Sequence, residues 1–158
     1  MSYQAIFATP FAALGIRTAR GCLTGIDFLP PGTACQPAQD AFTAQVCEQL
    51  AAYLADPAYA FDLPLSVMGT PFRQKVWQAL CAIPPGGPLT YGELARRLGS
   101  AARAVGQACG ANPIPIVIPC HRVVGKNGLG GFMGHGSGDP LDIKRWLLRH
   151  EQAERRPA

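Results

Sequence analysis

The residues with the most evident chemistry in this sequence are two neighbours, Cys120 and His121. A cysteine is a strong nucleophile only as the thiolate, and a free thiol has a pKa of about 8.5, so it needs help to ionise near neutral pH. The imidazole of His121 could accept the proton, directly or through a water molecule, while a carboxylate holds its other ring nitrogen. Glu151 is the best-placed carboxylate by position, which makes these three residues a candidate nucleophilic relay.

The segment before Cys120 favours chemistry over simple packing. Residues 114–118 are apolar enough to be buried, yet prolines at positions 113, 115 and 119 exclude a helix or a regular central strand. An irregular buried segment therefore delivers the cysteine next to the histidine. The competing interpretation is that Cys120 is a small buried side chain and His121 a surface residue, which would be the default for an arbitrary Cys-His pair.

Two short helices are expected ahead of this segment. Thr90 and Glu93 form the capping box of the first helix, and Gly99 ends it. Ser100 can cap the second helix, which is rich in small residues and runs over about 101–109. Two short helices joined by a tight turn with glycine are the outline of a helix-turn-helix, although many helical hairpins bind nothing.

The last helix is expected to begin at Asp139-Pro140, after a glycine-rich loop. Helical spacing predicts that its inward face comprises Ile143, Trp146, Leu147 and His150. Glu151 then lies at the edge of this face. A carboxylate near a helix C-terminus is electrostatically unfavourable, which favours a specific partner for it.

The N-terminal part has a different pattern. Alternating apolar residues over 3–29, with a turn at residues 19–21, predict an antiparallel hairpin, and Asp40 begins a helix over about 40–55. The expected fold class is therefore α/β in two parts. A small N-terminal domain, residues 1–66, has an antiparallel sheet and a helix, and a mostly helical domain, residues 67–158, contains the helix-turn-helix.

Composition limits the class of protein. Of 158 residues, 48% are hydrophobic and 15% charged, so the chain can bury a core and is not disordered. No apolar run approaches the roughly 20 residues that span a bilayer, and the first residues lack the pattern of a secretory signal, so a cytoplasmic protein without membrane contact is expected. The six cysteines do not cluster, which indicates reduced thiols and no metal site. Residues 67–158 carry 12 basic and 5 acidic side chains, a net charge of +7 that suits a polyanion.

The sequence resembles the O6-alkylguanine-DNA alkyltransferases over about residues 69–151. The resemblance rests on Pro119-Cys120-His121-Arg122-Val123, preceded by Asn112-Pro113 and followed by the run from Lys144 to Glu151. Thr90-Tyr91 and the run from Arg103 to Gly106 come in the family's order. Such a composite signature is far more specific than a lone Pro-Cys-His-Arg.

The resemblance implies DNA repair by direct transfer, without a cofactor, of the alkyl group from O6 of guanine to the protein's own cysteine. Each molecule would act once, as a methylated-DNA–[protein]-cysteine S-methyltransferase. The residues that match the family's catalytic positions are Cys120 as acceptor, His121 as its activator through water, Glu151 as the group that orients the histidine, Tyr91 as a donor to guanine N3 and Asn112 as a brace. A phenol at N3 would offset the negative charge that builds on the leaving guanine.

The resemblance also implies contacts with double-stranded DNA that contains O6-alkylguanine. Because O6 lies inside the duplex, the nucleotide must leave the stack, and the family's arginine at position 103 fills the vacated space. The matching DNA-binding positions are Thr90, Tyr91, Ser100, Arg103, Gly106 and Arg122, and those of the substrate pocket are Tyr91, Val123, Phe132 and Met133. Two alternatives stay open: Arg103 could bind only phosphate, and Arg122 could serve structure.

The loop over residues 132–140 is longer than the family's usual turn. The family encloses the base here with an aromatic side chain and the backbone, and the resemblance assigns Phe132 as that aromatic residue and the amide of Met133 as the contact to O6. Residues 1–66 contain no histidine, so the zinc of some members is not expected. The chain is expected to be a monomer in solution with a scaffolding N-terminal domain. Cooperative assembly on DNA, activity on O4-alkylthymine and the range of alkyl groups stay open.

Three alternative functions remain: a non-catalytic adaptor that binds alkylated DNA, a Cys-His hydrolase and a transcription regulator. The adaptors lack the reactive cysteine, which is present here as Cys120. A hydrolase would turn over repeatedly, and a regulator would need a dimerisation element or a sensor domain that the sequence does not reveal.

Overall fold

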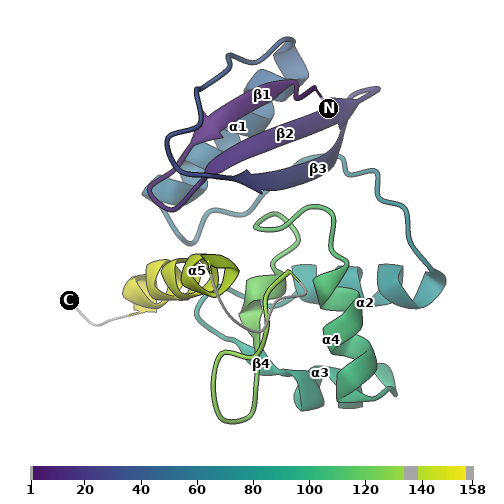
Figure 1. The fold of residues 1–158 in the computed structure, drawn as a ribbon. Coiled ribbons are helices and arrows are strands. Elements are labelled where there is room, and N and C mark those ends of the chain that lie inside the picture. The colour runs from purple at the N-terminus through teal and green to yellow at the C-terminus, as the bar shows by residue number, and fades with distance from the viewer. Residues whose placement is uncertain (1, 134–138, 156–158) are drawn as a thin grey trace. The chain divides into compact units, whose positions relative to one another are not determined.

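The computed structural model describes residues 2–133 and 139–155 and divides into two compact units, Met1–Val67 and Met68–Ala158 (Figure 1). The first unit is an antiparallel sheet with one helix, and the second is mostly helical. The predicted fold class is therefore confirmed. No helix within the described residues is both long enough and apolar enough to cross a membrane.

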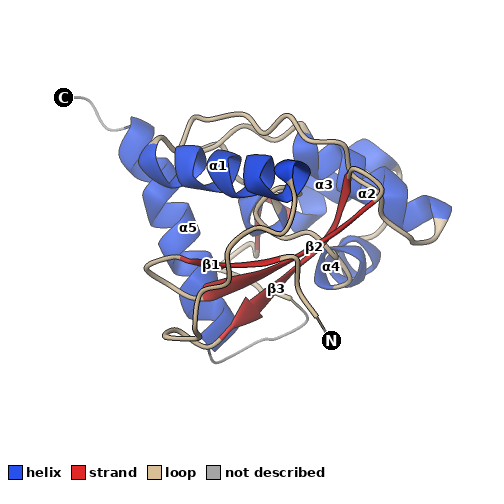
Figure 2. Ribbon diagram, turned by 90° about the horizontal axis from the view of Figure 1, so that it is seen from above, coloured by secondary structure: helices blue, strands red, loops and turns tan. Residues whose placement is uncertain are grey.

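The first unit is a three-stranded sheet covered on one face by a helix (Figures 1 and 2). Its strands are β1 (Ala5–Ala8), β2 (Ala13–Ala19) and β3 (Cys22–Leu29), in that spatial order, and α1 spans Ala41–Ala55. Arg20 and Gly21 both have positive φ, 54° and 72°, as a two-residue hairpin turn between right-twisted strands requires. Asp40 caps α1 as predicted, because its Oδ1 accepts a hydrogen bond of 2.7 Å from the amide of Thr43.

The second unit brings distant segments together through one short parallel pairing. Its elements are α2 (Pro71–Cys81), β4 (Leu89–Thr90), α3 (Tyr91–Leu98), α4 (Ala102–Gly110), the 3-10 turn η1 (Cys120–Arg122), β5 (Val123–Val124) and α5 (Asp139–Arg155). Leu89 pairs with Val123 and Thr90 with Val124. The start of α3 therefore lies beside the residues that directly follow Cys120.

The helix-turn-helix is formed by α3 and α4, with one difference from the expected caps. Thr90 and Glu93 make the predicted capping box, with hydrogen bonds of 2.9 and 3.1 Å. Ser100, however, does not cap α4, since the N-cap is Ala101 and makes no side-chain bond. The backbone of Ser100 instead completes the end of α3: its amide donates to the carbonyl of Ala95 (2.9 Å), next to Gly99 at φ 65°.

The buried stripe of α5 differs from the predicted face. It consists of Ile143, Lys144, Leu147 and Glu151. Trp146 and His150 are half-buried and stack on each other, with ring centroids 4.9 Å apart. Glu151 therefore lies in the buried stripe and not at its edge. The hydropathy pattern missed this arrangement because two of the four inward positions carry charged side chains.

Candidate active site

A pocket of about 380 Å³ opens in the second unit and brings together six of the thirteen predicted site residues. It is lined by Tyr91 of α3, by Ala102, Arg103, Gly106, Cys109 and Gly110 of α4, by Cys120 of η1, and by Gly131, Phe132 and Met133. Cys120 is only 3% exposed, so the pocket is its route to a reactant. Cys109 and Gly110 are lining residues that sequence reasoning did not assign.

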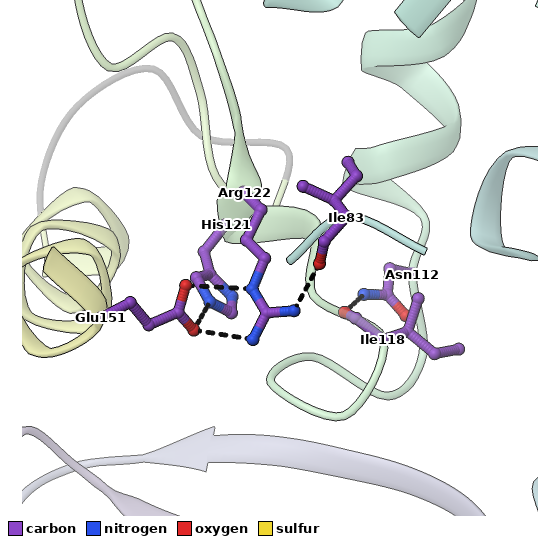
Figure 3. Close-up of polar contacts among 6 residues, drawn as sticks. All are labelled: Ile83, Asn112, Ile118, His121, Arg122 and Glu151. Atoms are coloured by element: carbon purple, nitrogen blue, oxygen red, sulfur yellow. Dashed lines mark hydrogen bonds and ion pairs between the residues drawn. The ribbon is translucent and has the colours of Figure 1, made fainter. Parts of the chain in front are cut away.

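The irregular segment before Cys120 is held by Asn112. The side-chain amide of Asn112 donates to the carbonyl of Ile118 (2.8 Å), and its oxygen accepts from the amide of Ile114 (2.9 Å), as Figure 3 shows in part. Between them Ile116 has a φ of 76°, a conformation that is costly for a β-branched residue and persists only where its surroundings enforce it. Asn112 is thus placed to keep this turn, and with it Cys120, in one conformation.

The carboxylate of Glu151 joins His121 and Arg122 in a buried cluster (Figure 3). His121 Nε2 lies 2.6 Å from Glu151 Oε2, while Arg122 donates through Nε to Oε1 (2.9 Å) and through Nη2 to Oε2 (3.0 Å). Arg122 Nη1 donates in addition to the carbonyl of Ile83 (2.7 Å). The cluster therefore connects α5, η1 and the chain that follows α2.

The electrostatics of this cluster fix the tautomer of His121. Burial alone would raise the pKa of Glu151, but the hydrogen bonds and charges of His121 and Arg122 outweigh it and lower the pKa to about 2. Burial lowers the pKa of His121, so the imidazole is neutral at pH 7. An ionised carboxylate only accepts hydrogen bonds, so Nε2 carries the hydrogen and Nδ1 is an acceptor. Nδ1 is buried and has no hydrogen-bond partner among the described residues.

The resting state of Cys120 is the protonated thiol. Burial raises its pKa to about 11, although a hydrogen bond from Asn112 and the charge of Lys144 act in the opposite direction. In the unliganded protein the effect of burial therefore outweighs the groups that favour the thiolate. The thiol needs a base at the moment of reaction, because it is not ionised beforehand.

Lys144 is a site residue that sequence reasoning missed. It is fully buried, and its Nζ donates to the carbonyls of Val123 (2.7 Å), Leu129 (2.6 Å) and Gly131 (2.8 Å). The ammonium also lies 5.7 Å from the ring centroid of Tyr91. Burial lowers the pKa of Lys144 to about 8, while Cys120 and Cys109 act to raise it. The one indication in the sequence was that Lys144 directly follows Ile143, an apolar residue of the buried stripe of α5.

Tyr91 lines the pocket as a neutral phenol. Burial, followed by the proximity of Cys109 and Cys120, raises its pKa to about 12. Its hydroxyl donates to the carbonyl of Gly131 (3.3 Å). Gly130 has a φ of 73°, and a Cβ there would stand 2.6 Å from the Tyr91 ring, so only glycine permits this close approach.

Several predicted residues are placed away from the pocket. Val123 is buried in β5 and does not line it. The guanidinium of Arg122 is buried in the Glu151 cluster, which supports its structural role over a DNA contact. The Thr90 side chain caps α3, and Ser100 is exposed in the turn before α4. Most of the long loop, residues 134–138, lies outside the described residues.

Comparisons with known proteins extend this picture. The sequence model of the family described as 6-O-methylguanine DNA methyltransferase, DNA binding domain, matches residues 71–153. The methylated-DNA–protein-cysteine methyltransferase of Methanosarcina mazei is 48% identical over 113 residues, which cover 70% of this chain and 69% of that protein. The protein of the same name from Methanosarcina acetivorans is 38% identical over 94% of this chain and 97% of that protein.

The similarity extends to solved structures of a Mycobacterium tuberculosis protein. Its OGT in complex with DNA has a TM-score of 0.78 at 39% identity, covering 94% of this chain and 92% of that one. A variant of the M. tuberculosis O6-methylguanine methyltransferase has a TM-score of 0.80 at 38% identity, covering 97% and 93%. This chain therefore belongs to the O6-methylguanine DNA methyltransferase family, as the sequence resemblance predicted.

The buried ion pair predicts a large stability effect of Glu151→Gln. The substitution leaves the Arg122 guanidinium buried without a charged partner, and breaking such a pair costs about 3 kcal/mol or more of the free energy of unfolding. Because the pKa of Glu151 is lowered on folding, its contribution is complete above the unfolded value of about 4.3 and is lost as pH falls from there toward about 2. Urea denaturation should therefore show a difference in the free energy of unfolding between the native chain and Glu151→Gln, and this gap should become smaller as the pH falls.

The control for this prediction is a double-mutant cycle. Arg122→Met combined with Glu151→Gln removes both charges and should cost clearly less than the sum of the single substitutions. Additive losses, or a gap that does not change with pH, would contradict the ion-pair account.

Lys144→Met should affect both stability and the reactivity of Cys120. It leaves three carbonyls without their donor, at an expected loss of about 3 kcal/mol in the free energy of unfolding. It also removes the positive charge that favours the thiolate, so iodoacetamide should modify Cys120 only at higher pH. The difference from the parent should shrink above about pH 8, where Lys144 itself loses its proton.

Lys75→Met is the matched control for Lys144→Met. The exposed Lys75 also donates to a backbone carbonyl, that of Leu98 (3.3 Å), and does not line the pocket. A Lys144→Met protein that is less stable but keeps the parent's pH profile of modification would show that the lysine only holds the loop.

Proposed function

We propose that this chain repairs DNA as a methylated-DNA–protein-cysteine methyltransferase that acts once per molecule. The sulfur of Cys120 attacks the alkyl carbon, the bond from that carbon to O6 of guanine breaks, and the alkyl group stays on the protein as a thioether. The observation that supports this most directly is the placement of Cys120 on the wall of a pocket, next in sequence to a buried histidine whose Nδ1 has no partner within residues 2–133 and 139–155.

His121 is the base that takes the thiol proton in this proposal. Because Nε2 of His121 is bonded to Glu151, the other ring nitrogen, Nδ1, is the one that can accept the proton. The proton can reach Nδ1 directly or through a bridging water. Once protonated, the imidazolium is stabilised by the carboxylate of Glu151, and the thiolate by Asn112 and the Lys144 ammonium. Glu151 and Arg122 are therefore positioning residues that act through His121.

Tyr91 and Lys144 would assist the departure of guanine. As guanine leaves, negative charge develops on the base, and a neutral phenol can donate a hydrogen bond to N3. The neighbouring ammonium over the Tyr91 ring strengthens that donor electrostatically. Tyr91 must then give up its present bond to Gly131, which at 3.3 Å is long for a hydroxyl donor.

The DNA surface in this proposal is the exposed face of α4. Arg103 is exposed and also borders the pocket, so it can stand at the point where an extruded nucleotide enters. Alanines and glycines elsewhere on the helix allow a close approach to the groove. Exposed basic residues of α2 and α3 can contact phosphates: Arg73, Lys75, Arg96 and Arg97.

The other functions from sequence are less well supported. A non-catalytic adaptor has no use for the Cys120–His121–Glu151 arrangement, and a hydrolase would have to release its product. A scaffolding role for the first unit, a cytoplasmic location, a monomer in solution and the absence of zinc belong to the same proposal.

The test of the proposed function is the covalent product. Mixing the protein with an oligonucleotide that contains O6-methylguanine should add one methyl group, about 14 Da, to each molecule, and peptide mapping should place it on Cys120. Cys120→Ser should bind the same DNA and gain no mass, since an alcohol is barely ionised near neutral pH. Cys35→Ser, at an exposed thiol of the first unit, should behave as the parent. Repeated turnover, or a methyl group on Cys109, would refute the proposal.

Arg103→Ala distinguishes base extrusion from simple phosphate binding. If the guanidinium fills the gap left by the nucleotide, repair of duplex DNA should slow by at least about tenfold, while the reaction with free O6-benzylguanine, which needs no extrusion, should be nearly unchanged. Arg97→Ala, at an exposed arginine outside the pocket, is the matched control and should only weaken DNA binding. Equal losses on both substrates would contradict the assignment of Arg103.

A further inference from the structure

Cys109 is a second thiol in the pocket of Cys120, and the proposed alkyl transfer assigns it no task. It is the penultimate residue of α4, is 5% exposed and borders the same cavity as Cys120. The remaining cysteines do not line this cavity: Cys22, Cys35, Cys47 and Cys81.

A single residue connects the two thiols. The amide of Asn112 donates to the carbonyl of Cys109 (3.2 Å), and its side chain donates to the carbonyl of Ile118 (2.8 Å) and acts to lower the pKa of Cys120. The amide of Cys120 donates to the same Ile118 carbonyl (2.8 Å). Asn112 thus joins the end of α4, which carries Cys109, to the turn that carries Cys120.

The electrostatics agree with this proximity. Burial, and then the neighbouring Cys120, raise the pKa of Cys109 to about 12. Lys144 interacts with both thiols. The two sulfurs therefore share one low-dielectric environment and one cation.

We propose that Cys109 is the resolving thiol for Cys120, so that a hydroperoxide converts the pair into an intramolecular disulfide that closes the site reversibly. The proposal rests on the proposed function only in taking Cys120 as the reactive thiol. A disulfide in this pocket would remove the nucleophile without consuming it.

The chemistry proceeds in two balanced steps. The Cys120 thiolate, its proton taken by His121, attacks a peroxide oxygen; an S–O bond forms, the O–O bond breaks, and the departing oxygen takes the proton from His121. The thiol of Cys109 then attacks the sulfenic sulfur; an S–S bond forms, the S–O bond breaks, and water leaves with the Cys109 proton. In total, two thiols and one hydroperoxide give one disulfide, one alcohol and one water.

The benefit of a resolving thiol follows from what happens without one. A sulfenic acid that is not captured is oxidised further to the sulfinic acid, which a thiol reductant does not reverse. A protein that uses its cysteine once would then be lost before it met a damaged base. Capture by Cys109 stops the oxidation at a reducible stage.

The experiment compares the native chain with Cys109→Ala, each normalised to its own activity before treatment. After hydrogen peroxide, the native monomer should lose about 2 Da under non-reducing conditions, and peptide mapping should link residues 109 and 120. Dithiothreitol should restore most of its methyl uptake. Cys109→Ala should instead be labelled by dimedone, gain about 32 Da at Cys120 on longer exposure, and recover less than about a tenth of its methyl uptake. Cys35→Ala should behave as the native chain.

Two outcomes would overturn the proposal: sulfinic acid formation at Cys120 at the same rate in the native chain and in Cys109→Ala, or a mass loss that maps to any other cysteine pair. Protein that has first reacted with the O6-methylguanine oligonucleotide carries a thioether and should show no loss of 2 Da. If that oligonucleotide adds no methyl group at all, the proposed function fails while the mass measurement on the disulfide still stands.

Discussion

The second unit depends on a buried carboxylate. A charge inside a protein is costly unless it is paired and its hydrogen-bonding capacity is met, and Glu151 meets this condition through Arg122 and His121. This arrangement sets three things at the same time: the charge states of Glu151 and His121, the tautomer of the imidazole, and the position of α5 relative to η1. The acceptor nitrogen of His121 exists because an ionised carboxylate occupies the other one. The same set of contacts made by Glu151 thus orients the histidine of the reactive centre and holds the last helix in place.

Polar side chains, more than secondary structure, hold the rest of the pocket. Two stretches of irregular backbone carry or directly precede lining residues: residues 111–119 lead to Cys120, and residues 125–133 include Gly131, Phe132 and Met133. In these stretches helix or sheet ladders satisfy few of the peptide groups. Asn112 supplies bonds to the first stretch and Lys144 to the second, while Arg122 reaches Ile83. Buried backbone groups must find partners, and a long side chain with several donors can serve peptide groups that no neighbouring strand reaches.

The sequence was sufficient for those features that local rules determine. The hairpin, the cap of α1 by Asp40, the capping box of α3 and the presence of an irregular buried segment before Cys120 all follow from spacing and turn chemistry. Position along the chain also indicated Glu151 as the partner of His121. What could not be predicted depends on burial of charged groups. A pattern that treats lysine and arginine as surface residues places Lys144 outside the core and Arg122 on the DNA, and it cannot reveal that Cys109 and Cys120 share a cavity. The rise of the Cys120 pKa on burial could not be predicted for the same reason, since desolvation is a property of the assembled pocket.

Several of the contacts that complete the site are between residues far apart in sequence. Arg122 and Ile83 are separated by 39 positions, His121 and Glu151 by 30, and Tyr91 and Gly131 by 40. Contacts of this kind form late in folding, because the entropy of closing long loops must be overcome before they contribute. On the ribosome, most of the unit has left the exit tunnel before Glu151 can reach its partners. A nascent or partly folded chain therefore carries an exposed thiol with the ordinary pKa of about 8.5. The completed domain gives Cys120 both its histidine base and its shielding from electrophiles in solution.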